Sequence, residues 1–150
     1  MRFNKYNHEG YRDPTTYEAF TNVERERSAA RTAMRQKQLN RHRPLVYICS
    51  PYAGDVSRNT RAAQRYCHHA VTMGCIPIAP HLLFPQFMND RIAEERELAV
   101  IMALVLLRKC SEVWVFGSDI TPGMQREIRK AQQIGRPIRY FDNTCREVAA

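Results

Sequence analysis

The sequence lacks the features that mark metal-binding, disulfide-stabilised and membrane proteins. Its five cysteines are odd in number and form no C-x-x-C pair, which argues against a zinc ribbon and a secreted disulfide framework. The longest apolar run, Leu98–Leu107, is far shorter than the roughly 20 residues that cross a bilayer. No His, Cys, Asp or Glu cluster has metal-ligand spacing. We therefore expect no metal, no other cofactor and no membrane partner.

A signal-peptide core is also missing, because the N-terminus reads Met-Arg-Phe-Asn-Lys. The sequence thus predicts a cytoplasmic protein. Its 150 residues, 44% hydrophobic and 25% charged, suit a folded domain with one real core.

Acidic residues are outnumbered, 15 to 23, for a net charge of +8. Residues 1–43 hold ten Lys or Arg against five Asp or Glu, so this segment carries most of the excess. A basic surface favours anionic partners such as nucleotides, nucleic acid or acidic protein faces. Nucleic acid is the less favoured partner, since aromatic residues are not interleaved with the arginines and no binding motif appears.

Two regions are expected: a basic helical arm over residues 1–43 and an α/β domain over 44–150. Residues 1–14 should be irregular. Thr15 and Glu18 fit a capping box before a helix from about Thr16 to Leu39. Its apolar stripe is thin, so the helix must pack on the main domain or on a second subunit. We predict a homo-oligomer, a dimer or higher.

Beyond Pro44, short apolar runs alternate with helical patterns, which predicts a Rossmann- or flavodoxin-like short parallel sheet flanked by helices on both faces. The expected strands are 45–49, 76–79, 112–116 and 137–141. Ser57 or Asn59 should cap the first helix of the domain. Residues 80–89 should form a loop, and Asp90 should cap a helix to Lys109 with a buried second half. A last helix should run from Pro122 to Ile134.

Ligands of such sheets bind at the carboxyl ends of the strands, where the loops 50–55, 80–84 and 117–123 converge. The third loop opens a helix and is rich in Gly, Ser and Thr, which suits a phosphate. Gly123 permits close approach, and Ser118 or Thr121 can donate a hydroxyl. Glu127, one turn on, can face the same cleft or simply interact with the helix dipole.

The segments Val46–Gly54, Thr121–Glu127 and Gly135–Ile138 resemble the nucleoside 2-deoxyribosyltransferase superfamily. That superfamily includes nucleoside 5′-monophosphate N-glycosidases and many relatives carried by phages and mobile elements. The resemblance covers about residues 45–141. It implies that Glu127 is a carboxylate nucleophile attacking the sugar C1′, and that Thr121 contacts a phosphate.

The resemblance also places Tyr47 near the sugar and base. A second carboxylate of the family is matched by Leu104, so the general acid would be Asp119 or His81. His81 could instead pack on Phe84, and Tyr52 could stack on a base or pack at the rim. The remaining candidate substrate-binding residues of the first loop are Ser50 and Gly54.

Three functions follow as hypotheses. The first is an N-glycosidase (a hydrolase) or 2-deoxyribosyltransferase acting on a nucleoside or nucleoside 5′-monophosphate. The second is a non-catalytic nucleotide-binding module that senses or sequesters its ligand, which the loss of an acid at Leu104 favours. The third is a phage or mobile-element interaction protein whose arm binds a partner.

Overall fold

The computed structural model describes residue 9 and residues 14–149. Two compact units follow one another along the chain, Met1–His42 and Arg43–Ala150. The described part of the first unit is mainly one helix, α1 (Pro14–Leu39). Because α1 begins at Pro14, Thr15 lies inside its first turn, and the prediction that Thr15 is the N-cap was wrong. The irregular segment predicted for 1–14 falls almost wholly outside the described residues.

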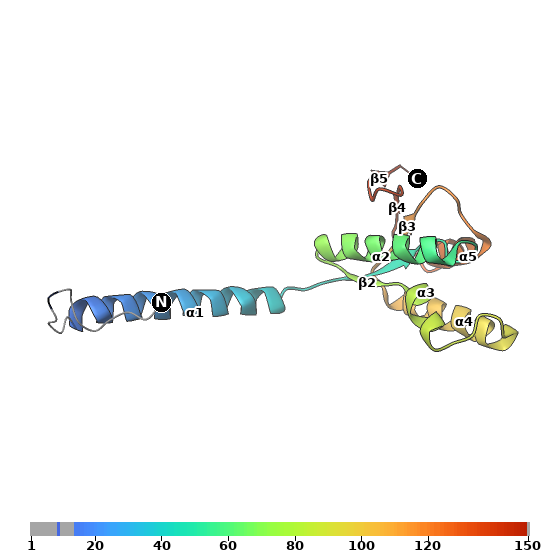
Figure 1. Ribbon diagram of the computed structural model, residues 1–150. Coiled ribbons are helices and arrows are strands. Elements are labelled where there is room, and N and C mark those ends of the chain that lie inside the picture. The colour runs from blue at the N-terminus through green and yellow to red at the C-terminus, as the bar shows by residue number, and fades with distance from the viewer. Residues whose placement is uncertain (1–8, 10–13, 150) are drawn as a thin grey trace. The chain divides into compact units, whose positions relative to one another are not determined.

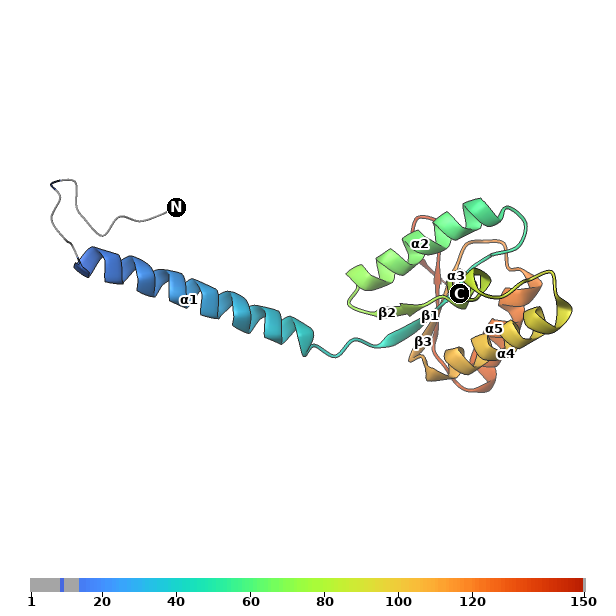
Figure 2. The same cartoon turned by 60° about the horizontal axis from the view of Figure 1, so that its bottom comes forward.

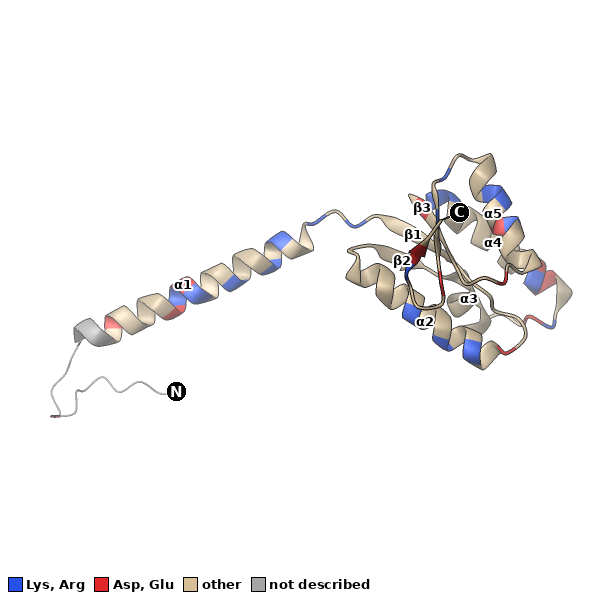
Figure 3. Ribbon diagram, turned by 90° about the horizontal axis from the view of Figure 1, so that it is seen from above, with Lys and Arg blue, Asp and Glu red and all other residues tan. Residues whose placement is uncertain are grey.

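The α1 helix is exposed along its length. From Tyr17 to Leu39 every side chain is exposed except that of Thr21, which is half-buried. Basic positions are distributed along the helix (Figure 3). The apolar side chains of Val23 and Met34 are 43% and 75% exposed.

The second unit is built on a five-stranded sheet in the order β2-β1-β3-β4-β5 (Figure 1). Its strands are β1 (Leu45–Cys49), β2 (Ile76–Ile78), β3 (Glu112–Phe116), β4 (Ile138–Phe141) and β5 (Glu147–Val148). The first four are mutually parallel where they pair, which confirms the predicted parallel sheet. The antiparallel β5 was not predicted, since two exposed residues carry no strand pattern.

The helices of this unit are α2 (Val56–Thr72), α3 (Pro80–Leu83), the 3-10 helix η1 (Phe84–Gln86), α4 (Ala93–Lys109) and α5 (Pro122–Gln133). Three expectations need correction. The cap of α2 is Asp55, whose side chain accepts the Arg58 N–H at 3.0 Å, and neither Ser57 nor Asn59. Residues 80–89 contain α3 and η1 rather than only a loop. Asp90 precedes α4 without capping it, because Ile92 is the N-cap.

Successive strand side chains point to opposite faces of the sheet, so the core has two halves. Val46, Ile48 and Trp114 pack with Tyr66 and other α2 side chains. Tyr47, Cys49, Val113 and Val115 pack on the other face with Leu107 of α4 and with Met124 and Ala131 of α5. Figure 2 shows α2 on one side of the sheet and α4 and α5 on the other.

The expectation of a buried second half for α4 was wrong. Leu107 is its one fully buried side chain, whereas Leu98, Ile101 and Val105 are 50%, 53% and 48% exposed. These three recur at helical spacing on one stripe. A helix lying on a sheet covers only its inward stripe, so the apolar composition of α4 exceeds what the sheet can bury. No helix within the described ranges is long and apolar enough to cross a membrane.

Candidate active site

A pocket of about 320 Å³ opens at the carboxyl ends of β1 and β3. The chain passes from β1 to β2 on one side and returns to β3 on the other, so this is the switch point where open α/β sheets bind ligands. The loop after β1, the α3–η1 segment, α4 and the start of α5 all contribute walls. The volume suits a small organic molecule.

Glu127 forms the α5 wall of the pocket. The Tyr47 hydroxyl on β1 donates a hydrogen bond of 2.7 Å to Glu127 Oε1. Burial raises the pKa of Glu127 above its ordinary range, while hydrogen bonds from Cys49 and Tyr47 act in the opposite direction. Burial, with the nearby Glu127 charge, also raises the pKa of Tyr47, so its phenol keeps the proton that it donates. The Tyr47 hydroxyl therefore holds the carboxylate in one orientation at the pocket wall.

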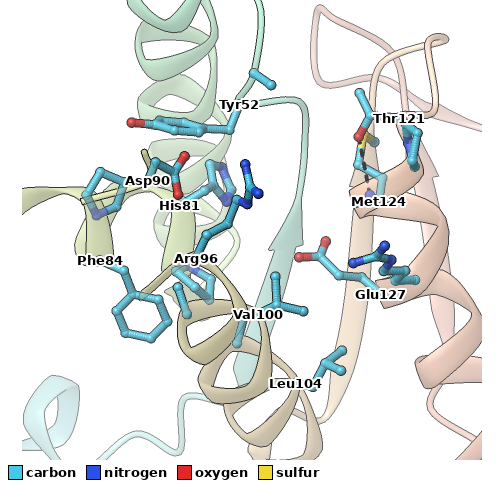
Figure 4. Close-up of a pocket in the computed structure, with 18 of the residues that line it drawn as sticks. Tyr52, His81, Phe84, Asp90, Arg96, Val100, Leu104, Thr121, Met124 and Glu127 are labelled. Carbon is cyan, nitrogen blue, oxygen red and sulfur yellow. Dashed lines mark hydrogen bonds between the residues drawn. The ribbon is translucent and has the colours of Figure 1, made fainter. Parts of the chain in front are cut away.

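Ser50 and His81 form the opposite wall. Ser50 Oγ and His81 Nε2 share a hydrogen bond of 3.0 Å, and the Tyr52 ring centroid lies 6.4 Å from that of His81. Burial lowers the pKa of His81 to about 4, so the imidazole is neutral at neutral pH. In Figure 4, Tyr52 and His81 lie across the pocket from Thr121, Met124 and Glu127.

The α5 N-terminus reaches the pocket through Thr121 and Gly123. Thr121 Oγ1 accepts the Met124 N–H at 3.3 Å, and Thr121 O accepts the Gln125 N–H at 2.9 Å. Pro122 has no N–H. Within the described part of the chain, this leaves Gly123 as the first-turn N–H without a protein acceptor.

The structure brings together six of the predicted site residues as pocket lining and one just behind it. Those that line the pocket are Ser50, Tyr52, His81, Thr121, Gly123 and Glu127. Tyr47 is fully buried and touches the pocket only through its bond to Glu127.

Gly54, Ser118 and Asp119 do not line the pocket and are exposed. Gly117 has a φ of +91°, a left-handed conformation that turns the chain directly after β3. Ser118 and Asp119, the next two residues, lie outside the pocket.

Sequence reasoning missed Asp90, Arg96 and Arg126, all of which line the pocket. Asp90 was interpreted as a helix cap. The α4 stripe that faces the pocket is Arg96, Ala99, Val100, Ala103 and Leu104, at i, i+3, i+4, i+7 and i+8. That periodicity was available in the sequence and could have identified Arg96. Among the residues that the structure describes, no three His, Cys, Asp or Glu side chains gather as a metal site.

Stability should depend on pH through His81. The folded protein keeps this imidazole neutral down to about pH 4, whereas an unfolded histidine protonates near 6.5. Between those values the unfolded state binds more protons, so stability should fall as the pH falls. Thermal unfolding midpoints between pH 7 and pH 4.5 should decline less in His81→Gln than in the wild type. His68→Gln, at an exposed histidine of α2, is the matched control; equal slopes for wild type and His81→Gln would contradict the assignment.

The sequence and the fold were compared with those of known proteins. No curated protein matches the chain. A solved 2-deoxyribosyltransferase from Bacillus psychrosaccharolyticus is similar at 14% identity and a TM-score of 0.57, over 70% of this chain and 77% of that one. A 2-desoxiribosyltransferase from Leishmania mexicana is similar at 14% identity and a TM-score of 0.48, over 66% of this chain and 64% of that one.

The first of these similarities confirms the predicted nucleoside 2-deoxyribosyltransferase-like fold. The family described as "Domain of unknown function (DUF7768)" matches residues 44–141, which hold the whole sheet except β5 and every residue of the pocket. The chain belongs to this family.

Proposed function

We propose that the chain is an N-glycosidase or 2-deoxyribosyltransferase that acts on a nucleoside or a nucleoside 5′-monophosphate. One observation carries the proposal: the Glu127 carboxylate stands at the pocket wall with one oxygen held by the buried Tyr47 hydroxyl. A carboxylate held in this way is oriented to attack an electrophilic sugar carbon. The 2-deoxyribosyltransferase-like fold supports the same conclusion.

The reaction has two displacements. A carboxylate oxygen of Glu127 forms an ester bond to C1′ as the C1′–N bond breaks, and the base leaves with the bonding electron pair and takes up a proton. Water, or a second base, then attacks C1′ and releases the Glu127 carboxylate. Water gives hydrolysis, and a second base gives transfer.

The apolar part of the pocket accommodates the base. Phe84, Val100 and Leu104 line it from η1 and α4, and Tyr52 offers an aromatic face. The neutral His81 imidazole, fixed by Ser50, supplies hydrogen bonds to the sugar or base. Of the two candidate general acids, His81 lies in the pocket and Asp119 does not. Because the His81 imidazole is neutral at neutral pH, it acts as a hydrogen-bond donor to the leaving base, and the proton that the base takes up comes from water.

Incubation with a panel of nucleosides and 5′-monophosphates tests the proposal. Chromatography should detect released base from at least one member. Adding a different free base should divert product to a new nucleoside if the protein is a transferase. Base release from no member of the panel would contradict both activities.

A non-catalytic nucleotide-binding role is the second candidate. Leu104 and Ala103 line the pocket where the family resemblance places a second carboxylate. A protein that binds nucleotides measurably by calorimetry but releases no base over many hours would support this role over catalysis.

We also propose that the chain is a homo-oligomer, with residues 1–43 as an arm and 44–150 as the nucleotide-binding domain. Val23 and Met34 of α1 are apolar and exposed, which favours packing of the arm on a second subunit. The exposed α4 stripe of Leu98, Ile101 and Val105 is a second apolar surface of the same kind.

Deletion of residues 1–43 should lower the oligomeric state measured by light scattering and leave the 44–150 domain folded by circular dichroism. Ile101→Glu in the full-length chain tests the exposed α4 stripe by the same light-scattering measurement. A full-length protein that is monomeric at tens of micromolar would contradict the proposal. An unchanged oligomer after the deletion would show that the arm is not the contact.

A further inference from the structure

Arg96 breaks the apolar pattern of the helix face that lines the pocket. Of the five α4 residues in the lining, the other four are Ala99, Val100, Ala103 and Leu104. Figure 4 shows the Arg96 side chain extending from α4 into the space between His81 and Glu127. A long cationic side chain at this place points to a ligand with a negative group.

Arg96 is not paired with an acidic side chain of the part of the chain that the structure describes. Within the described ranges, its guanidinium makes no ion pair, and neither does that of Arg126 on the α5 wall. The acidic lining residues Asp90 and Glu127 are thus not paired with either arginine. Both guanidinium groups keep their five N–H donors for water or for a ligand.

The α5 N-terminus alone is a weak anion site. Pro122 has no N–H, and Thr121 accepts the Met124 and Gln125 N–H groups through its side chain and carbonyl. In the first turn of α5, the Gly123 N–H is therefore the backbone donor that is left to bind an anion. A doubly charged phosphate needs more donors than this, and the two arginines of the same pocket supply them.

We propose that Arg96, assisted by Arg126, recognises a phosphate group, so that the pocket selects a nucleoside 5′-monophosphate over the bare nucleoside. This inference rests on the proposed function and names its substrate class. The apolar α4 residues that line the pocket then contact the base, and the two arginines and the Gly123 N–H contact the phosphate. Arg96 is a specificity-determining residue here and takes no part in bond breaking.

Calorimetry on the full-length Glu127→Gln protein tests the inference without turnover. The probes are the four common 2′-deoxynucleosides and their 5′-monophosphates. Adding Arg96→Gln should weaken monophosphate binding by about 10- to 100-fold and change nucleoside binding by less than about threefold. Arg96→Lys should retain part of the preference, since it keeps the charge and loses the bidentate fork.

Arg108→Gln is the matched control, because Arg108 lies on the same helix outside the pocket and engages Arg136 only through its backbone carbonyl. It should leave both affinities unchanged. Equal losses for nucleoside and monophosphate in Arg96→Gln would overturn the inference, because Arg96 would then contact the base or sugar. Base release from nucleosides as fast as from monophosphates would overturn it while the proposed function stands. A protein that neither binds nor cleaves any probe would overturn both.

Discussion

Glu127→Gln is expected to abolish base release, with a loss of roughly 10⁴-fold or more, as when a covalent nucleophile is removed elsewhere. Glutamine has nearly the same shape, and its amide oxygen still accepts the Tyr47 hydroxyl bond seen at 2.7 Å. It cannot form the ester to C1′. The variant should therefore fold and bind ligand while no glycosyl-enzyme adduct appears by mass spectrometry.

Glu94→Gln is the matched control, since Glu94 is an exposed carboxylate in the first turn of α4 and does not line the pocket. Its turnover should equal that of the wild type. Wild-type turnover by Glu127→Gln would show that Glu127 is not the nucleophile.

The same substitution has a consequence for stability. Burial raises the pKa of Glu127, so the folded state holds its proton more tightly than the unfolded state. Above the ordinary glutamate range the folded state binds more protons, and stability declines as the pH rises through the raised pKa. Glutamine carries no charge, so it avoids the cost of burying an ionised carboxylate. Glu127→Gln should therefore melt at a higher temperature than the wild type at neutral pH.

Trp114→Ala is expected to cost about 3–5 kcal/mol of unfolding free energy. Trp114 is 1% exposed in the centre of the sheet, with its ring centroid 5.0 Å from that of Phe141. Its Nε1–H donates to Glu112 Oε2 at 2.7 Å, and the Arg139 guanidinium lies 4.9 Å from its ring centroid. Urea unfolding should show a lower midpoint with a similar slope.

Trp114 packs on the α2 face of the sheet, while Tyr47 and the Glu127 wall belong to the opposite face. Ligand affinity at low temperature should therefore change little. Trp114→Phe, which keeps an aromatic ring, should lose less stability than the alanine variant. A loss below about 1 kcal/mol in Trp114→Ala would contradict the packing described here.

The parallel sheet was predictable because its two central strands, β1 and β3, are buried on both faces. Runs such as Leu45–Cys49 and Glu112–Phe116 are apolar almost throughout, which is typical of strands buried on both faces. The helix starts were less predictable. A cap depends on the backbone angles of one residue, so the sequence pointed to Ser57 or Asn59 and the actual cap, Asp55, was not named.

The candidate site was predictable where loops follow strands, and less so where a helix contributes. Tyr47 and Glu127 are 80 residues apart and meet in one hydrogen bond. The family resemblance implied that each lies near the sugar, but it did not predict this bond. Arg96 was missed because an arginine near the start of an exposed helix also fits a solvated surface. Asp119 shares a loop with Thr121, but Asp119 is exposed and only Thr121 lines the pocket.

The two edges of the sheet determine whether another strand can be added to it. The Ile76 N–H bonds inward to Pro44 O at 2.8 Å, so the next residue, Pro77, has its backbone nitrogen on the open side of β2. A proline there offers no donor to an incoming strand. The opposite edge, β5, is two residues long. Neither edge is a good template for strand addition, so the fold is protected against edge-to-edge aggregation.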